Sequence, residues 1–556
     1  KVYLNGDFWG VYGIREKIDE KWAQYNFELP NDDVDLMNSW NVLAGDRQHF
    51  DALLVELSAD PNGATFYNTA ASYLNIQNHV DYIAAETFYQ NLDWFGILWG
   101  ANNIKLWRPR TPDGKWSYVL YDTDACLGTF GGNVNSNYLN NALNPLVAND
   151  HSYVFNRLVL NPDYRRYFIN RYADLMNTTW QPAEFQQLRN EMKADMEDAM
   201  PQHIDRWPEM ANLNSWNFYT QAMVNYTTNR LNGARQNILE TFELPEMHTI
   251  QLDVDPVGAG YILISTIVPE NYPWSGVYFE DNTFEITAVA NPGYEFGYWE
   301  QNALLPDGTD ENSITVNLSQ AVTYTAVFAG TSAPMDLQIT ELNYNSHPSH
   351  VTGDWVEIYN ASETDMELGM HWIQDLNVLN KFTFPIGTML GAGERLIVAQ
   401  NPEQFTTWHP NVSNVYGPAA CEFDNGGDFV ALMDPWGNEI VSFTYEDSFP
   451  WPVGADEWGH TLELIDSTNA NDPASWADGC MFGSPGEAAG PCAEEMTITE
   501  INVASSLGFD TGDWLEITNT SPDFVNLQGW GLSDNGGAPF INLTPMMLAP
   551  GDRAVI

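Results

Sequence analysis

Basic residues are scarce in this 556-residue sequence, which has 21 Lys and Arg against 75 Asp and Glu and a net charge of −54. No acidic tail accounts for this balance, because the shortage of cations runs through the whole chain. Such a surface repels nucleic acid and anionic membranes, so neither is expected as a partner. It suits a protein exposed to salt or to cations, which screen its self-repulsion.

Cysteine is also rare, with four residues in the chain. None of them lies in a CxxC pair or in a Cys/His spacing typical of zinc, which argues against a structural zinc site. Cys480 and Cys492 bound the short Gly- and Pro-rich segment CMFGSPGEAAGPC. This pair is a disulfide candidate, and the alternative is two unrelated free thiols.

Long apolar runs are missing too, since no stretch approaches the roughly 18 residues that a membrane-spanning helix needs. The GxSxG, HExxH and Gly-Lys phosphate-loop motifs are absent, which leaves those hydrolase and nucleotide-binding classes without support. A glycosidase using two of the many carboxylates is compatible with the composition but has no motif behind it. Both ends of the sequence are typical of strand interiors, so we expect a longer protein, and the missing signal peptide is uninformative.

Aromatic residues are abundant, with 21 Trp, 26 Tyr and 27 Phe, and this composition is typical of folded domains rather than disordered chains. A chain of this length is too long for one hydrophobic core. Changes of pattern along the sequence predict four parts: residues 1–244, 245–330, 331–492 and 493–556.

The first part mixes strands with helices. Alternating apolar positions around the turn dipeptide Asn5-Gly6 predict a hairpin, and a second hairpin is predicted over residues 104–122. Residues 78–91 have apolar positions at helical spacing, and further helical segments follow in the second half of this part. We therefore expect an α+β fold, mostly helical, for residues 1–244.

The later parts are predicted to be all β. Residues 247–328 alternate between apolar and polar positions and contain Gly, Pro and Asn turns. Beyond a short linker, GDWVEIYN recurs as GDWLEITN 159 residues later, which indicates two copies of one β domain, the second truncated. Glu341 and Glu357 recur as Glu500 and Glu516. Such recurrence is more typical of folding than of catalysis, for instance of side chains that satisfy backbone amides at strand ends.

Several stretches of the first part occur in the order of a known family: YLNGDFWGVYGIREKID, NLDW followed by NNIKLWR, GKWSYVLYDTDACLG and NRLNGARQNILETF. On these motifs residues 1–244 resemble the spore-coat-protein-H (CotH) kinase family. The resemblance implies an atypical protein-kinase-like fold, dominated by the helical C-terminal lobe, that uses ATP with Mg²⁺ or Mn²⁺. It also implies phosphate transfer to Ser or Thr of extracellular or coat proteins by a secreted or cell-surface bacterial protein.

The resemblance also assigns roles to individual residues. Phosphoryl transfer needs divalent metal ions, oxygen ligands that hold them and a carboxylate near the acceptor hydroxyl. The kinase signature orders these groups as an Asp, an Asn and a metal-binding Asp at a later strand end. Asp93 is then the catalytic aspartate, Asn102 or Asn103 a metal ligand, and Asp122 or Asp124 the main metal carboxylate. Apart from the resemblance, a loop carboxylate satisfied by backbone amides and a solvent-facing strand end are the commoner explanations.

Two departures from the family pattern bear on activity. The upstream half, which supplies the lysine for the ATP phosphates, is absent, so the 556 residues alone are expected to be inactive. Related sequences have both asparagines directly after the aspartate motif, as DWPGNN, whereas ILWGA intervenes here and could move Asn102 and Asn103 away from Asp93. Glu16 and Lys17 lie where the family's nucleotide cleft begins, and they are either nucleotide-binding residues or surface charges.

The remaining parts resemble two kinds of β module. GYEFGYWE and TYTAVF in residues 245–330 are similar to bacterial cell-surface repeats. ITELNYN, GDWVEIYN and GSPGEAAG in residues 331–492 resemble the lamin-tail domain, an immunoglobulin-like β-sandwich, and residues 493–556 resemble a truncated second copy. These modules leave a second function open, that of a catalytically inactive CotH-like scaffold or adhesion protein whose β modules bind surface proteins or glycans.

Overall fold

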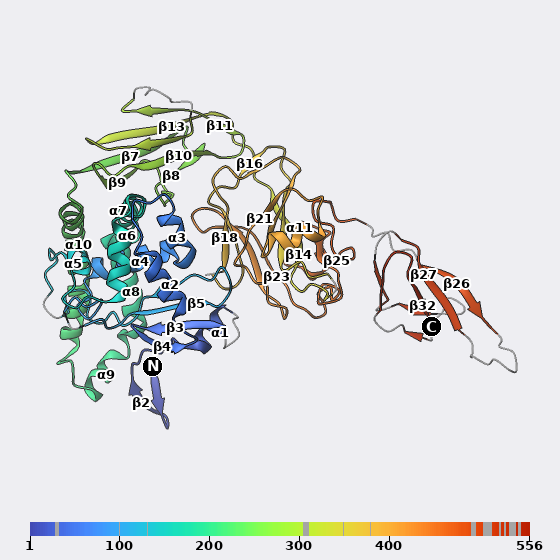
Figure 1. Cartoon of the computed structure of the whole chain (residues 1–556), viewed down its shortest axis with the longest axis horizontal. Helices are drawn as coiled ribbons and strands as arrows, with labels where there is room; N and C mark the ends of the chain where they lie inside the picture. The colour runs from blue at the N-terminus through green and yellow to red at the C-terminus, as the bar shows by residue number, and fades with distance from the viewer. Residues whose placement is uncertain are drawn as a thin grey trace. The chain divides into compact units, whose positions relative to one another are not determined.

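A computed structural model gives the fold of the chain (Figure 1). It describes residues 1–27, 33–98, 100–129, 132–303, 311–348, 350–378, 380–490, 496–503, 514–521, 524–527, 530–532, 541–542 and 546–556. The chain forms two compact units, residues 1–288 with 296–328 and residues 289–295 with 329–556.

In the first unit, a four-stranded antiparallel sheet of order β4-β3-β5-β6 accompanies a separate β1–β2 hairpin. The hairpin turns at Asn5 and Gly6, whose φ angles of 53° and 90° suit an Asn-Gly turn, as the sequence predicts. The strands are β1 (Val2–Leu4), β2 (Asp7–Gly10), β3 (Val34–Asn38), β4 (Asn41–Ala44), β5 (Lys105–Pro109) and β6 (Ser117–Val119).

Helices make up most of the rest of residues 1–244, and several begin at residues with clear start signals. Asn75, Asn149 and Asn161 are N-cap residues whose side chains accept backbone N–H groups, and Pro182 occupies the first turn of its helix. The helices are α1 (Glu20–Phe27), α2 (Gln48–Glu56), α3 (Phe66–Tyr73), α4 (Ile76–Tyr89), α5 (Tyr138–Leu143), α6 (Asp150–Val159), α7 (Pro162–Asn177), α8 (Pro182–Glu197), α9 (Met200–Arg206) and α10 (Leu213–Phe242).

Helix α4 contacts α5, α7, α10 and β6 and therefore lies in the middle of this region. Val80, Ile83 and Phe88 are fully buried at helical spacing. Arg230 of α10, itself 1% exposed, donates hydrogen bonds to the carbonyls of Thr87 at 3.1 Å and Phe88 at 2.8 Å. These bonds satisfy carbonyls at the end of α4, where helices lack internal partners, and so fix the point where the candidate site begins.

The β-repeat region of the first unit is joined to helix α7. It contains a four-stranded sheet of order β11-β13-β7-β9, in which β13 and β7 are parallel, and a three-stranded sheet of order β12-β10-β8. The strands are β7 (Met247–Asp255), β8 (Gly260–Ile264), β9 (Trp274–Phe279), β10 (Phe284–Ala290), β11 (Tyr294–Gln301), β12 (Ser313–Val316) and β13 (Val322–Gly330). Asn177 of α7 bonds both the N–H and the carbonyl of Val277 at 3.0 Å, which ties β9 to the helix.

The second unit begins with two sheets around one core, an arrangement typical of a β-sandwich. The sheets have the orders β21-β20-β15-β14-β24-β25 and β18-β17-β22-β23. Leu342 and Val356 of the first sheet share a buried cluster with Val430 and Phe443 of the second. The elements are β14 (Leu337–Asn343), β15 (Trp355–Asn360), β16 (Met366–Glu367), β17 (Trp372–Gln374), β18 (Lys381–Thr383), β19 (Met389–Leu390), β20 (Arg395–Ala399), α11 (Pro402–Trp408), β21 (Val415–Tyr416), β22 (Phe429–Met433), β23 (Glu439–Thr444), β24 (Leu462–Leu464), η1 (Pro473–Ser475) and β25 (Trp476–Asp478).

The internal repeat predicted from the sequence recurs in the strand pairing. Strands β14 and β15 place Glu341 opposite Glu357 after a bulge, and strands β26 and β27 place Glu500 opposite Glu516 after a bulge at the matching position. The strands of the second copy are β26 (Met496–Asn502), β27 (Trp514–Asn519), β28 (Val525–Asn526), β29 (Gly531–Leu532), β30 (Ile541–Asn542), β31 (Met547–Leu548) and β32 (Arg553–Val555).

The glutamates of the first copy have a folding role. Glu341 accepts the Ser484 N–H at 2.9 Å, and Glu357 accepts the Gly486 N–H at 2.6 Å. Burial raises the pKa of both carboxyl groups. The recurring glutamates therefore tie a loop to the sheet through its backbone amides, as the sequence predicts.

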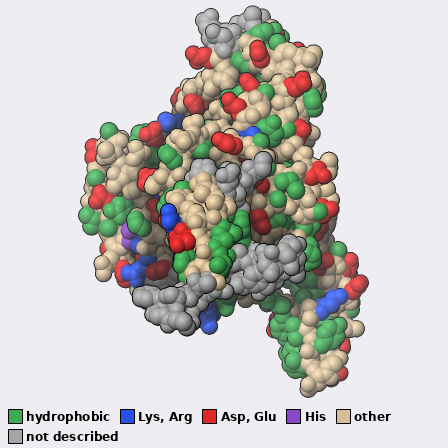
Figure 2. Space-filling view, turned by 90° about the vertical axis from the view of Figure 1, so that its right-hand side faces the viewer, with side chains coloured by type: hydrophobic (Ala, Val, Ile, Leu, Met, Phe, Trp, Pro, Cys, Tyr) green, Lys and Arg blue, Asp and Glu red, His purple; other side chains and the backbone are tan. Residues whose placement is uncertain are grey.

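Figure 2 shows Asp and Glu side chains spread over one face of the molecule with only a few Lys and Arg among them, in keeping with the composition. Within the described residues, no helix has both the length and the apolar character that a membrane crossing requires.

Candidate functional site

The candidate site begins where helix α4 ends. Gln90 caps the helix in the left-handed region, with φ of 59°. It accepts a hydrogen bond from the Tyr226 hydroxyl and donates one to the Ser136 carbonyl at 2.7 Å. The fully buried Asn91 follows, and its side-chain oxygen accepts the Asp93 N–H at 3.1 Å. The backbone that carries Asp93 is therefore fixed from both the helix and the loop.

Asp93 is the centre of a small hydrogen-bond cluster with the two asparagines. The Asn102 amide donates to one Asp93 carboxylate oxygen at 2.8 Å. The Asn103 amide donates to the Asp93 carbonyl at 2.9 Å and to the second carboxylate oxygen at 3.3 Å. The structure thus brings together the three residues that the sequence separates by nine and ten positions.

The inserted ILWGA residues form a closed loop instead of displacing the asparagines. The Gly96 N–H donates to the Gly100 carbonyl at 2.7 Å, which brings these two glycines together. Ile97 and Ala101 are buried, and the Ala101 carbonyl accepts the hydroxyl of Ser39 at the end of β3. The insertion therefore leaves the side chains of Asn102 and Asn103 in contact with Asp93.

Asp122 and Asp124 follow strand β6, on a segment that is bonded to the Asp93 loop. The Leu92 N–H donates to the Ala125 carbonyl at 3.4 Å, and the Leu127 N–H donates to the Tyr89 carbonyl at 2.9 Å. Asp122 is half-buried, whereas Asp124 is exposed.

The three carboxylates nevertheless do not converge on one point. Asp93, Asp122 and Asp124 do not form a group whose ligand oxygens all lie within 4.8 Å of one another. Within the described residues, the one such group of His, Cys, Asp and Glu is on the β repeat, at Glu246, His248 and Glu280.

Two of the candidate ligands, Asn103 and Asp122, differ from their neighbours Asn102 and Asp124 in backbone conformation. Asn103 and Asp122 have φ angles of 55° and 54°, in the left-handed region, which Asn and Asp adopt more often than most other non-glycine residues. Phe95 in the same loop has φ of 61°. Such conformations cost free energy and are concentrated at functional sites, where the surrounding structure holds them in place. Because Asn and Asp adopt this region readily, the backbone alone does not choose between Asn102 and Asn103 or between Asp122 and Asp124.

Glu16 and Lys17 lie at the surface beyond the first hairpin. Asn26 donates to the Glu16 carboxylate at 3.1 Å, and the Lys17 ammonium lies 2.9 Å from the Asp19 carboxylate. The positive charge of Lys17 helps to lower the pKa of Lys105 on β5, which puts Lys17 within electrostatic range of that strand.

The sequence did not single out two ionisable residues near the site, Glu86 and Lys105. Glu86 of α4 is 1% exposed, and burial raises its pKa to about 8. The Asn91 amide opposes this shift, although neither Glu86 oxygen makes a hydrogen bond of good geometry among the described residues. Lys105 is 7% exposed. The indication for Glu86 was a carboxylate three residues after Ile83 in an apolar helical stripe, whereas no local pattern in the sequence singles out Lys105.

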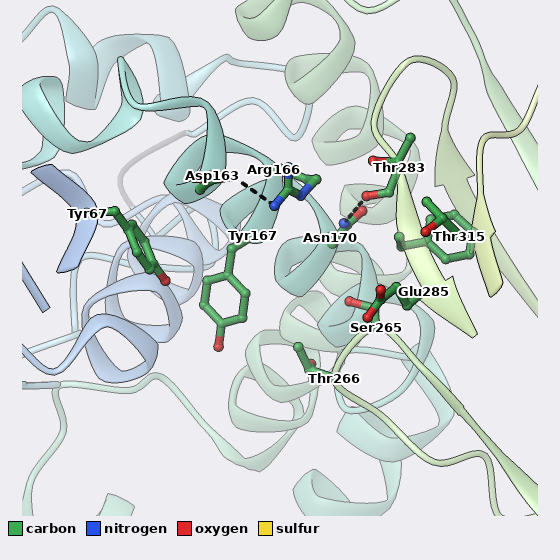
Figure 3. A pocket seen from close by; sticks show the side chains of 11 residues that line it. Tyr67, Asp163, Arg166, Tyr167, Asn170, Ser265, Thr266, Thr283, Glu285 and Thr315 are labelled. Carbon is green, nitrogen blue, oxygen red and sulfur yellow. Dashed lines mark hydrogen bonds and ion pairs between the residues drawn. The ribbon is translucent and has the colours of Figure 1, made fainter. Parts of the chain in front are cut away.

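A cleft lies on the first unit, between helix α7 and the β repeat (Figure 3). This cleft encloses about 710 Å³. It is lined by two tyrosines, an Asp–Arg pair, a glutamate and several amide and hydroxyl groups: Tyr67, Asp163, Arg166, Tyr167, Asn170, Ser265, Thr266, Thr283, Phe284, Glu285 and Thr315. The lining is mainly polar and carries charges of both signs.

Cys480 is disulfide-bonded, and Cys126 and Cys421 are buried free thiols. Cys492, the partner expected from the sequence, lies outside the described residues.

The fold and these sites define a multidomain protein in which an α+β domain is followed by all-β modules. Residues 1–233 match the CotH kinase protein family, as the sequence motifs predict. Residues 271–332 match the divergent InlB B-repeat domain, and residues 330–447 match the lamin tail domain.

Comparison with solved structures gives two bacterial proteins. A DUF4876 family protein from Bacteroides thetaiotaomicron is 13% identical over 48% of this chain and 88% of that chain, with a TM-score of 0.14. A DUF3823 family protein from Parabacteroides merdae is 11% identical over 35% of this chain and 94% of that chain, with a TM-score of 0.10. TM-scores this low define no common fold. No curated protein matches the chain.

Proposed function

We propose that residues 1–244 bind a metal–nucleotide complex and that, in the intact protein, this domain transfers phosphate from ATP to Ser or Thr of extracellular or surface proteins. The observation that carries the proposal is the contact of Asn102 and Asn103 with Asp93 across the inserted loop. The family match of residues 1–233 supports the reaction class. The B-repeat and lamin-tail modules support a location outside the cell or on its surface.

The side chains present fit a hard divalent cation such as Mg²⁺ or Mn²⁺, which prefers oxygen ligands. Asn102 and Asn103 direct their amide nitrogens to Asp93, so their amide oxygens remain as acceptors. Asn103 and Asp122, both in the left-handed region, would hold the metal, with Asn102 and Asp124 as the alternatives. Bound metal and ATP supply a phosphoryl group whose charge is neutralised. Asp93 would orient the acceptor hydroxyl and accept its proton.

A titration of the full chain with ATP, with and without Mn²⁺, tests this proposal. We expect Mn²⁺-dependent binding that Asp122→Ala abolishes and that Asp93→Ala leaves within about threefold, because a proton acceptor contributes little to ground-state affinity. The exposed Asp60→Ala, on the loop after α2, is the matched control. The proposal fails if binding is independent of metal, or if Asp122→Ala binds as the wild type does.

A second candidate function, a non-catalytic adhesion or scaffold protein that binds glycans, is favoured by the cleft of Figure 3. Tyr67 and Tyr167 offer aromatic faces, and Asp163 and Glu285 offer acceptors for sugar hydroxyls. A glycan array probed with the wild type and with a Tyr67→Ala, Glu285→Ala double variant tests this function. Signals that the variant loses, together with an absence of metal-dependent nucleotide binding, would favour adhesion over the kinase proposal.

A further inference from the structure

Lys105, the first residue of β5, is a largely buried residue whose ammonium has no carboxylate partner. It is 7% exposed, and its ammonium lies 4.0 Å from the centre of the Tyr121 ring. Within the part of the chain that the structure describes, this ammonium forms no ion pair and no hydrogen bond. Arg108 on the same strand shows the usual alternative, since its guanidinium pairs with the buried Asp35 at 2.8 Å.

This lack of a partner is unusual in a chain with 75 acidic and 21 basic residues. An ammonium that has lost part of its hydration is destabilised unless a carboxylate or hydrogen-bond acceptors compensate for the loss. Burial lowers the pKa of Lys105, and Lys17 lowers it further, while Asp19 and Asp122 act in the opposite direction. The Tyr121 ring offers a cation–π contact, which replaces only part of the lost hydration.

The position of Lys105 connects it to both halves of the candidate metal site. It follows Asn103 by two residues, and Tyr121, the ring beneath its ammonium, directly precedes Asp122. Asp122 is close enough to act on Lys105 electrostatically but does not form an ion pair with it. The ammonium therefore lies beside the candidate ligands with its charge unneutralised.

We propose that Lys105 binds a phosphate oxygen of the metal-bound nucleotide. This inference rests on the proposed function and names the cation that meets the phosphates. A polyphosphate that approached Asp93, Asp122 and Asp124 without a cation would be repelled, and a lysine supplies a compact positive charge suited to a single phosphate oxygen. Lys17, exposed and paired with Asp19, would at most add long-range attraction.

The opposite explanation is that Lys105 is a packing residue whose stem covers apolar surface while its head group stacks on Tyr121. The two explanations differ in what they predict for Lys105→Met, which keeps the unbranched stem and removes the charge. A packing role predicts unchanged nucleotide affinity. A phosphate-binding role predicts weaker binding of polyphosphates and unchanged binding of the free metal.

The test is calorimetric titration of the full chain with Mn²⁺ alone, MnATP and Mn-pyrophosphate, in wild type, Lys105→Met and Lys105→Arg. Lys115→Met, an exposed lysine on the same β5–β6 hairpin, is the control. We expect Lys105→Met to weaken MnATP and Mn-pyrophosphate at least tenfold while changing Mn²⁺ affinity less than twofold. Lys105→Arg should retain affinity within about threefold, and Lys115→Met should bind as the wild type does.

The outcomes distinguish a failure of the role proposed for Lys105 from a failure of the proposed function. Equal MnATP affinity of wild type and Lys105→Met, with binding still lost in Asp122→Ala, would overturn the role of Lys105 and leave the proposed function standing. Absence of MnATP binding in the wild type would overturn both. Thermal melting shows whether Lys105→Met is folded. The variant is expected to melt within a few degrees of the wild type, because methionine keeps the unbranched stem of the lysine. If Lys105→Met fails to fold, wild-type affinity in Lys105→Arg sustains the proposal, and a tenfold loss at unchanged Mn²⁺ affinity contradicts it.

Discussion

The side-chain amide of Asn103 donates a hydrogen bond to the backbone carbonyl of Asp93 at 2.9 Å, although ten positions separate the two residues. The intervening loop closes between Gly96 and Gly100. The shape of the candidate site therefore depends on a side-chain contact that holds a strained loop, and this dependence can be tested by mutation.

Replacing Asn103 by Ala is expected to open the Asp93 loop. The change removes two hydrogen bonds to Asp93 and is expected to lower the free energy of unfolding by about 1–2 kcal/mol, since each such bond contributes about 1 kcal/mol. Mn²⁺ affinity should fall about tenfold, because an amide oxygen ligand is lost as well. Urea unfolding and Mn²⁺ titration measure the two effects. Asn68→Ala, at an exposed position of α3, is the control, and an Asn103→Ala variant that matches it in both would contradict the assignment.

Glu86 is expected to make the stability of the first unit depend on pH. Its pKa is raised to about 8 in the folded protein from an ordinary value of 4.5, so the folded state binds the proton more tightly than the unfolded state. Its contribution to stability is full below pH 4.5 and is lost as the pH rises through about 8. Glu86→Gln, which cannot ionise, should therefore be more stable than the wild type at pH 9, on the order of a few kcal/mol.

Thermal melting of the wild type and Glu86→Gln at pH 5, 7 and 9 measures this effect. The advantage of the variant should grow steadily with pH, whereas Glu56→Gln, at an exposed position of α2, should follow the wild type. A difference that does not change with pH would show that Glu86 does not titrate in this range.

Asp174 on α7 is expected to hold the β repeat to the helical region. It is fully buried and accepts hydrogen bonds from the Tyr278 hydroxyl at 2.6 Å and the Thr266 hydroxyl at 2.7 Å. Asp174→Ala removes the acceptor of both hydroxyls, although that of Thr266 keeps a bond from Arg171 at 2.9 Å, and it should cost about 3 kcal/mol. In urea, the transition of the first unit should split into two as the helical region and the β repeat separate. Asp163→Ala, exposed on the same helix, is expected to keep a single transition, and the same result for Asp174→Ala would refute the docking role.

Glu357 is expected to stabilise the first lamin-tail copy. Its carboxylate accepts hydrogen bonds from Arg395 at 2.9 Å, Thr340 at 2.6 Å and the Gly486 N–H at 2.6 Å. Glu357→Ala leaves the Arg395 guanidinium with no carboxylate partner and should lower stability by about 3–5 kcal/mol. Tryptophan fluorescence during denaturation measures the loss. Glu446→Ala, at an exposed position, should lose less than about 0.5 kcal/mol, and an equal effect of the two variants would exclude the role of Glu357.

The sequence predicts much of the fold because the residues that form turns and begin helices act locally. Asn5-Gly6 forms the expected hairpin turn, Pro182 begins a helix, and the repeat recurs as the same strand pairing. Helices α2 and α3 were not predicted, since their buried faces are short and each buries only two residues along its length.

The site was predictable in part. Its residue types and their order are visible in the sequence, but the contact of Asn103 with Asp93 depends on loop closure and on Ser39, more than sixty residues earlier. The burial of Glu86 and Lys105 is likewise set by distant elements packed around them. No local pattern singles out Lys105, because the elements that cover a strand can lie far away along the chain.

Pulsed electron–nuclear double resonance of Mn²⁺ bound to the full chain with ATP tests the central claim most directly. We expect one bound Mn²⁺ with a phosphorus coupling from ATP. The coupling should be lost in Asp122→Ala and kept in Glu280→Ala, a variant of the Glu246, His248 and Glu280 group on the β repeat. A coupling that survives Asp122→Ala, or Mn²⁺ binding that only Glu280→Ala removes, would contradict the account.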